Sequence, residues 1–227
     1  MVPIRSRFQR FALISLSALA VFGMAGLQGA ELSSAEAAQL LQGLSQRPEA
    51  SGVRLRFREE RRLPLLTEPV REEGTLWFQA PDKFRREVPG GSVTVSDGQT
   101  LWLYYPEVRQ AEKYPLARNR LLSDSLRAIT AALNLQNEGK QFAIRIEENN
   151  GGYRVDLTPL RGAMRKAVQS ISVWLSASLN LEKIQIRGTQ GEDTQIQFSE
   201  ERPLKPGEGD FTFSPPQGVN VSEPLGR

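Results

Sequence analysis

The chain has 227 residues, 39% of them hydrophobic, so it is long enough for one sizeable core and too apolar to be disordered throughout. It contains no histidine and no cysteine. These absences exclude Ser-His-Asp and Cys-His catalysis, zinc sites built on imidazole, disulfides and a thioether-linked lipid.

The N-terminus has the three-part pattern of a secretory signal peptide. Arg5, Arg7 and Arg10 come first with no acid, and an uncharged run and then small residues follow. We expect residues 1–30 to be the signal peptide and residues 31–227 to form one exported domain.

The cleavage position is open, because Ala25 and Ala37 fit the small-x-small rule better than Ala30 does. An uncleaved membrane anchor is the alternative, which the short apolar run disfavours because serines and glycines interrupt it. Removing residues 1–30 takes away three arginines and no acid, so 29 basic residues become 26 against 26 acidic ones. The exported protein is then close to neutral, which gives no support to nucleic-acid binding.

Residues 32–44 are predicted to form an amphipathic helix. Ser33 and Glu36 have the spacing of a capping box. A stripe at i, i+3, i+4 and i+7 gives the helix one apolar face, formed by Ala37, Leu40, Leu41 and Leu44.

Short strands are predicted for most of the remaining chain. Residues 52–60 alternate apolar residues with arginines, and residues 74–110 form a tight meander with turns at 80–82, 89–91 and 96–98. A second helix is predicted at 122–133, where Leu122, Leu126, Ile129 and Leu133 share one face. Strands then follow from Phe142 to a last one at 211–213. Ten to twelve short strands with regular turns favour a barrel or a strongly curved sheet with an apolar interior.

Pairs of acidic residues, such as Glu59-Glu60 and Glu72-Glu73, are where a hydrolase hypothesis would begin. Adjacent residues on a strand point to opposite faces, so no such pair can act together as acid and base within one segment. We therefore interpret them as solvated strand ends, and we expect no enzyme activity, no metal and no cofactor.

Two motifs resemble the family of outer-membrane lipoprotein carriers, the LolA family. The first comprises Gly74-x-Leu76-Trp77, Pro81-x-Lys83-Phe84-Arg85 and Val95-Ser96-Asp97-Gly98-Gln99-Thr100-Leu101-Trp102-x-Tyr104-x-Pro106. The second, about 110 residues later, is Phe211-Thr212-Phe213-Ser214-Pro215-Pro216-Gln217-Gly218-Val219. Two positions depart from the family pattern. Ala80 stands where an arginine often helps to hold the lid, and Arg86 stands where tryptophan is common.

The resemblance implies a mainly β protein with helices (α+β), an incomplete antiparallel β-barrel with a helical lid over a hydrophobic cavity. It implies a monomeric periplasmic chaperone that binds lipoprotein acyl chains and serves outer-membrane biogenesis. The expected partners are an inner-membrane ATP-binding transporter, which supplies lipoproteins, and an outer-membrane acceptor, which receives them. A carrier of non-protein lipid and an envelope sensor or scaffold of the same fold remain alternatives.

The lipid-binding residues expected from this resemblance are apolar residues of the sheet and of the second helix. They are Phe57, Leu76, Phe78, Phe84, Val95, Leu101, Leu103, Leu126, Ile129, Leu133, Ile144, Ile146, Val173 and Ile186. Leu40 of the first helix is expected to join them. Ordinary core packing is the competing interpretation for each.

Overall fold

The computed structural model describes residues 30–47, 51–118, 123, 135, 141–160, 162 and 164–224. The predicted signal peptide and almost all of the predicted helix at 122–133 lie outside these residues. Within the described part, no helix is long and apolar enough to cross a membrane.

The first half of the chain contributes one helix and a six-stranded meander. Its elements are α1 (Ser34–Ser45), β1 (Gly52–Arg62), β2 (Val70–Gln79), β3 (Lys83–Glu87), β4 (Val93–Ser96), β5 (Thr100–Tyr105) and β6 (Gln110–Pro115), with short 3-10 turns at Pro106–Val108 and Leu116–Arg118. The second half adds β7 (Phe142–Asn149), β8 (Gly152–Pro159), α3 (Met164–Ala167), β9 (Val168–Leu175), β10 (Leu181–Gly188), β11 (Asp193–Pro203) and β12 (Asn220–Ser222).

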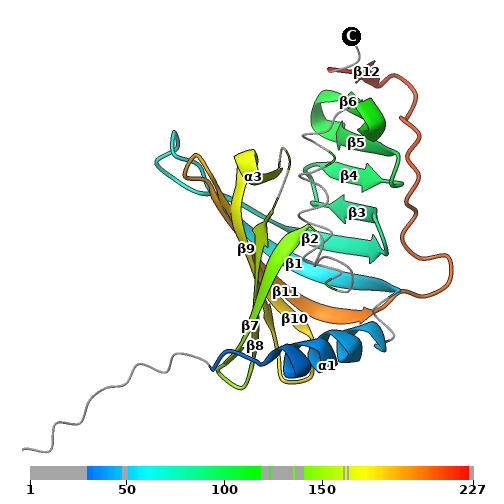
Figure 1. Ribbon diagram of the computed structural model, residues 1–227. Coiled ribbons are helices and arrows are strands. Elements are labelled where there is room, and N and C mark those ends of the chain that lie inside the picture. Colours follow the sequence, from blue (N-terminus) through cyan, green and yellow to red (C-terminus); the bar gives the residue numbers. More distant parts are fainter. Residues whose placement is uncertain are drawn as a thin grey trace, which may run out of the picture.

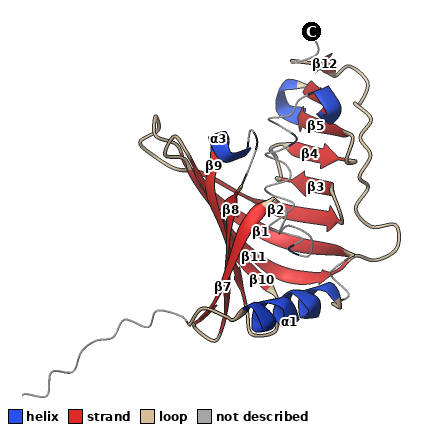
Figure 2. Cartoon of the chain, viewed as in Figure 1, coloured by secondary structure: helices blue, strands red, loops and turns tan. Residues whose placement is uncertain are grey.

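The twelve strands of the described residues belong to one sheet, in the order β12-β6-β5-β4-β3-β2-β1-β11-β10-β9-β8-β7. Neighbours pair antiparallel except β12, which runs parallel to β6. The sheet curves so strongly that β3–β6 and β7–β9 lie on facing sides, and it does not close (Figure 1). The predicted fold class is thus confirmed: an open, incomplete barrel that is mostly strand (Figure 2).

Helix α1 begins as its capping box predicts. Ser33 Oγ accepts from Glu36 N, and the Glu36 carboxylate accepts from Ser33 N at 2.8 Å. The Ser33 hydroxyl, which also donates to the Glu36 carboxylate at 2.7 Å, and the Ser33 N–H lower the pKa of Glu36. Leu40 is buried against strands of the second half, and Arg47 at the helix end donates to the carbonyl of Leu179 in the β9–β10 turn.

The C-terminal segment differs from the prediction, because residues 211–213 are not a strand. The Phe213 ring instead packs across β5, with its centroid 5.4 Å from that of Trp102 and 5.3 Å from that of Tyr104. A short strand was predicted here, but the segment is held against the sheet by tilted contacts between aromatic rings. The last strand forms only at β12, at the edge of the sheet (Figure 1).

Candidate functional site

A cavity of about 530 Å³ opens on the face of the sheet that we call the inner face. Residues from β1–β5 form one side of it and residues from β10 and β11 form the other, so it lies inside the curve of the sheet. Its apolar walls are Phe57, Leu76, Phe84, Leu101, Leu103, Ile184, Ile186, Ile196 and Phe198. Its polar lining is Glu59, Arg61, Glu72, Arg86, Ser92, Thr94 and Tyr105.

The register explains why these residues meet. Leu76 pairs with Arg86, Arg86 with Thr94, and Thr94 with Leu103, which makes one row across four strands. A second row, separated from the first by the pair of Gly74 and Phe57, runs from Glu72 through Glu59 and Ile196 to Ile184. Side chains in such rows point to one face of the sheet, so the cavity wall is a product of strand pairing.

Six of the fourteen residues predicted to bind lipid line this cavity. They are Phe57, Leu76, Phe84, Leu101, Leu103 and Ile186. Phe78 lies beside them but is only 1% exposed, packed in the core cluster that contains Phe84.

Four other predicted residues lie elsewhere in the described structure. Ile144, Ile146 and Val173 pack in a second core cluster, together with Leu40 of α1. Val95 does not line the cavity, because it pairs with Arg85 and Trp102 on the outer face, whereas its neighbour Ser96 pairs with Phe84 and Leu101. The remaining three, Leu126, Ile129 and Leu133, lie outside the described residues.

An ionic cluster, formed by Glu59, Arg61, Glu72 and Arg86, stands in the wall of this apolar cavity. Arg86 Nη2 donates to Glu59 Oε2 at 3.0 Å and to Glu72 Oε2 at 2.6 Å. The side chains of Glu59 and Arg86 are only 11% and 19% exposed. The Arg86 guanidinium also stacks on the Phe57 ring, 4.5 Å from its centroid, which is a cation–π contact.

Arg61 is held more loosely than Arg86. Its Nε lies 3.7 Å from Glu59 Oε1 and its Nη2 lies 3.7 Å from Glu72 Oε2, both too long for hydrogen bonds. Nε is nevertheless buried, and it makes no hydrogen bond within the described chain. A buried donor without a partner costs about 1–3 kcal/mol.

The stability of the fold does not account for this cluster. Removing paired charges from water costs several kcal/mol per ion, and well-packed apolar residues often do as well or better in the same place. Four charges, two of them little exposed, therefore need a reason beyond folding.

Tyr105, which lines the cavity, and Tyr114, which packs against the core cluster beside it, keep their protons. Burial, with the nearby Glu112 and Glu72 carboxylates, raises the pKa of Tyr105. Burial and the hydrogen bond to Glu112, at 2.8 Å, raise the pKa of Tyr114 to about 12. Both hydroxyls are hydrogen-bond donors at neutral pH.

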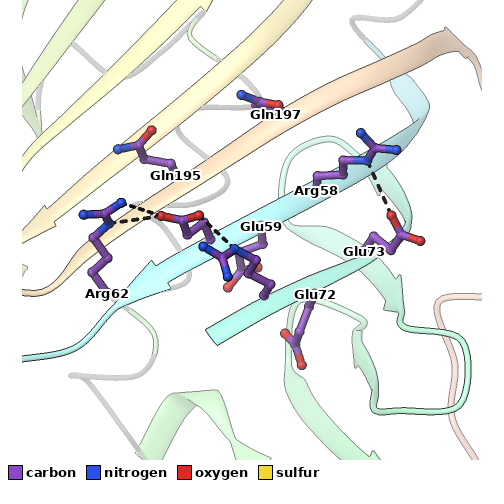
Figure 3. Close-up of a pocket in the computed structure, with 9 residues that line it drawn as sticks. Arg58, Glu59, Arg62, Glu72, Glu73, Gln195 and Gln197 are labelled. Atoms are coloured by element: carbon purple, nitrogen blue, oxygen red, sulfur yellow. Dashed lines mark hydrogen bonds and ion pairs between the residues drawn. The ribbon is translucent and has the colours of Figure 1, made fainter. Parts of the chain in front are cut away.

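The outer face of β1, β2 and β11 carries a second, polar groove of about 440 Å³. Figure 3 shows the Arg58–Glu73 ion pair there, with the Glu72 side chain pointing away from it. Arg58 and Glu73 are 80% and 69% exposed, so their ion pair at 3.4 Å contributes little to stability. Among the described residues, no group of three or more acidic side chains, histidines or cysteines could hold a metal ion.

Sequence reasoning missed the ionic cluster and, apart from Ile186, the β10–β11 wall. The interpretation of Glu59 as a solvated strand end was wrong, because its side chain is 11% exposed inside the cavity. The alternation along β1 contained a signal for this cluster, because Glu59 and Arg61 are on the same face of the strand as Phe57. Arg86, which stands where the family commonly has tryptophan, was a second signal for the cluster.

Comparison with known proteins assigns the chain to a family. The family described as "Outer membrane lipoprotein carrier protein LolA" matches residues 50–214. The chain belongs to this family.

Two relatives agree with this membership, and one solved structure shares the fold. An outer-membrane lipoprotein carrier protein of Chromobacterium violaceum is 32% identical over 160 residues, 66% of this chain and 73% of the relative. One from Serratia proteamaculans is 29% identical over 154 residues, 66% of this chain and 71% of the relative. An uncharacterised conserved protein of Thermus thermophilus has the same fold, with a TM-score of 0.51 at 13% identity over 83% of this chain and 99% of that one.

The LolA motif around Asp97 is a turn motif in this structure. Asp97 Oδ1 accepts from Gln99 N at 2.8 Å and from Thr100 N at 2.7 Å, which closes the β4–β5 hairpin. Gly98 has φ +88°, and a side chain there would meet the Asp82 carboxylate of the β2–β3 turn. The motif therefore fixes the turn before β5, the strand whose Leu101 and Leu103 line the cavity.

Proposed function

We propose that this LolA family protein carries lipoproteins by holding their acyl chains in the inner-face cavity. The observation that supports this most directly is the cavity itself, with nine apolar residues in its walls inside an open sheet. Its volume of about 530 Å³ falls within the roughly 300–1,000 Å³ of sites that bind small molecules. A carrier of this kind works by reversible binding and needs no catalytic group.

Reversibility requires that burial be partial. An acyl chain of about fifteen methylenes gains about 12 kcal/mol on full burial, at about 0.8 kcal/mol per methylene. Three such chains would exceed the practical ceiling of about 20 kcal/mol for non-covalent binding, and release would then be too slow for transport. A cavity that is open to one side is consistent with a cargo that is buried in part.

Family membership supports a proposal for the route of transport. We propose that residues 1–30 direct export, and that residues 31–227 act as a monomeric carrier in the periplasm. An inner-membrane ATP-binding transporter would load it, and an outer-membrane acceptor would unload it. The helix predicted at 122–133, with Leu126, Ile129 and Leu133, is proposed as the lid that moves during loading.

A release assay tests the proposal. Purified protein is incubated with spheroplasts, and lipoproteins are measured in the supernatant. We expect release by the native protein and strongly reduced release by Leu103→Gln, which places an amide in the cavity wall. Val93→Gln is the matched control, because Val93 lies on the neighbouring strand and on the outer face. Equal release by both variants would contradict the role of the cavity.

The ligand recovered from the protein separates the carrier from its alternatives. Mass spectrometry of extracted material should find acylated peptides or lipoproteins. Recovery of non-protein lipids alone would indicate a carrier of another cargo. Failure to bind any amphiphile, together with no release, would favour a sensor or scaffold.

A further inference from the structure

The ionic cluster is unusual because its charges balance inside an otherwise apolar cavity. Two arginines face two glutamates, so the cluster has no net charge and offers no strong field to a free anion. A ligand with a full negative charge would be attracted to the arginines but repelled by Glu59 and Glu72. A neutral group that accepts hydrogen bonds meets no such repulsion.

The two arginines retain donors that the protein does not use. In Arg86, only Nη2 donates within the described residues, so Nε and Nη1 remain available. In Arg61, Nε is too buried for a ligand to reach, but the contact of Nη2 with Glu72 is too long to be a hydrogen bond, so the terminal nitrogens keep their donors. A guanidinium can donate five hydrogen bonds, so both side chains have free donors beside the apolar wall.

The positions of these donors match a particular ligand. Arg86 lies in one row with Leu76 and Leu103, and its guanidinium stacks on Phe57, so an alkyl chain on these residues would run past it. The atoms next to such a chain are an ester or amide carbonyl when the chain is attached to glycerol or to an amino group. A carbonyl is a neutral acceptor of the kind that the charge balance favours.

We propose that Arg61 and Arg86 bind the neutral carbonyl group that links an acyl chain to its carrier molecule, so that the cavity selects ester- or amide-linked chains. This proposal rests on the proposed function, because it assumes that an alkyl chain occupies the cavity. Glu59 and Glu72 act as positioning residues: they hold Arg86 on the cavity wall and reduce the attraction for free fatty-acid anions.

A pair of ligands that differ only at the carbonyl tests the proposal. Monopalmitoylglycerol and hexadecylglycerol carry the same chain length and the same glycerol, but the first has an ester and the second an ether. Each displaces the neutral probe N-phenyl-1-naphthylamine from purified protein, and the fluorescence decrease gives its affinity. We expect the ester to bind about tenfold more tightly than the ether, and also more tightly than palmitate.

A variant that keeps the net charge of the cavity tests whether the ionic cluster causes the preference for the ester. Glu72→Gln/Arg86→Met removes one charge of each sign and leaves Glu59 with Arg61, so the net charge of the cavity is unchanged. We expect the ester-to-ether ratio to fall to about twofold. The control is Arg58→Gln/Glu73→Gln, which removes an ion pair from the outer face of β1 and β2 and should leave the ratio near ten. Arg61→Gln, at a more exposed side chain, tests the same donors if the double variant does not fold.

Two results would overturn the proposal: a ratio near one in the native protein, or a ratio that stays near ten in both cavity variants. If ester and ether bind equally while lipoproteins are still released from spheroplasts, this inference fails and the carrier function stands. If no amphiphile displaces the probe and no lipoprotein is released, both fail together.

Discussion

The two halves of the sheet use the same inner face in opposite ways. In the second half, residues of β7–β10 are covered by α1 and by Leu135 and Met164, and many of them are fully buried. In the first half, β1–β5 carry a smaller core cluster and leave a cavity in front of it. Apolar alternation is present in both halves. What differs, among the described residues, is whether another element covers the face.

The packed region and the region with the cavity are expected to contribute to different properties, stability and binding. A solid core gains free energy from close packing, and small changes of volume there are costly. Side chains in a cavity wall lack part of that close packing, and a bound ligand supplies the missing contacts. The packed core of β7–β10 is therefore expected to determine whether the protein folds, and the cavity wall of β1–β5 with β10 and β11 what it binds.

The largest effect is expected in the packed half. Leu157 is fully buried on β8, and Leu157→Ala removes its contacts and leaves a hole. We expect a loss of about 3 kcal/mol in the free energy of unfolding. Chemical denaturation measures this loss, and probe binding by the protein that remains folded should be unchanged. A loss below about 1 kcal/mol would show that this half is not the rigid one.

A backbone contact at the cavity margin should give the next largest effect. A Cβ on Gly74 would lie 1.9 Å from the carbonyl oxygen of Glu87 and 3.0 Å from the Phe57 ring. Gly74→Ala should force β2 away from β3 and cost about 2 kcal/mol. Gly43→Ala is the control, because Gly43 lies in α1 with ordinary space around it, and alanine favours a helix. Equal stability of the two variants would contradict the close approach at Gly74.

These contrasts show what the sequence could predict. Local signals placed the strands and turns of the meander, because alternation and residues such as Asp97 and Gly98 act within a few positions. The prediction that Val95 points to the inner face was wrong. Alternation shows which residues of one strand share a face, but it does not continue through the turn at Gly90 and Gly91 into the next strand.

The candidate site was only partly predictable for a related reason. Glu59 and Glu72 are Cα partners on β1 and β2, and Arg86 joins them from β3, so the cluster exists only through strand register. Register is a property of pairing between segments distant in sequence. Whether an apolar face is covered or left open also depends on elements elsewhere in the chain, as Leu40 shows in the second half.

Filling the cavity should affect binding and leave stability almost unchanged. Thr94 lines the cavity between Arg86 and Leu103, and Thr94→Phe would place a ring in the space proposed for the acyl chain. We expect the affinity for the fluorescent probe to fall about tenfold, equivalent to about 1.4 kcal/mol. Thermal unfolding should shift little. Unchanged affinity in a folded variant would show that the cavity is not the binding site.

The smallest expected effect is a change in alkaline stability at the cavity end of β6. The pKa of Tyr114 is raised to about 12 in the folded protein, by burial and by its hydrogen bond to Glu112, against about 10 when unfolded. Between these values the folded state binds the proton more tightly, so this contribution is fully present below about pH 10 and is lost as pH rises through about 12. Denaturant midpoints of the native protein should therefore fall more steeply over this window than those of Tyr114→Phe. Glu112→Gln should give an intermediate slope, because it keeps the burial and removes the carboxylate. Parallel curves for all three proteins would mean that Tyr114 is solvated, and that the open half of the sheet admits water as far as β6.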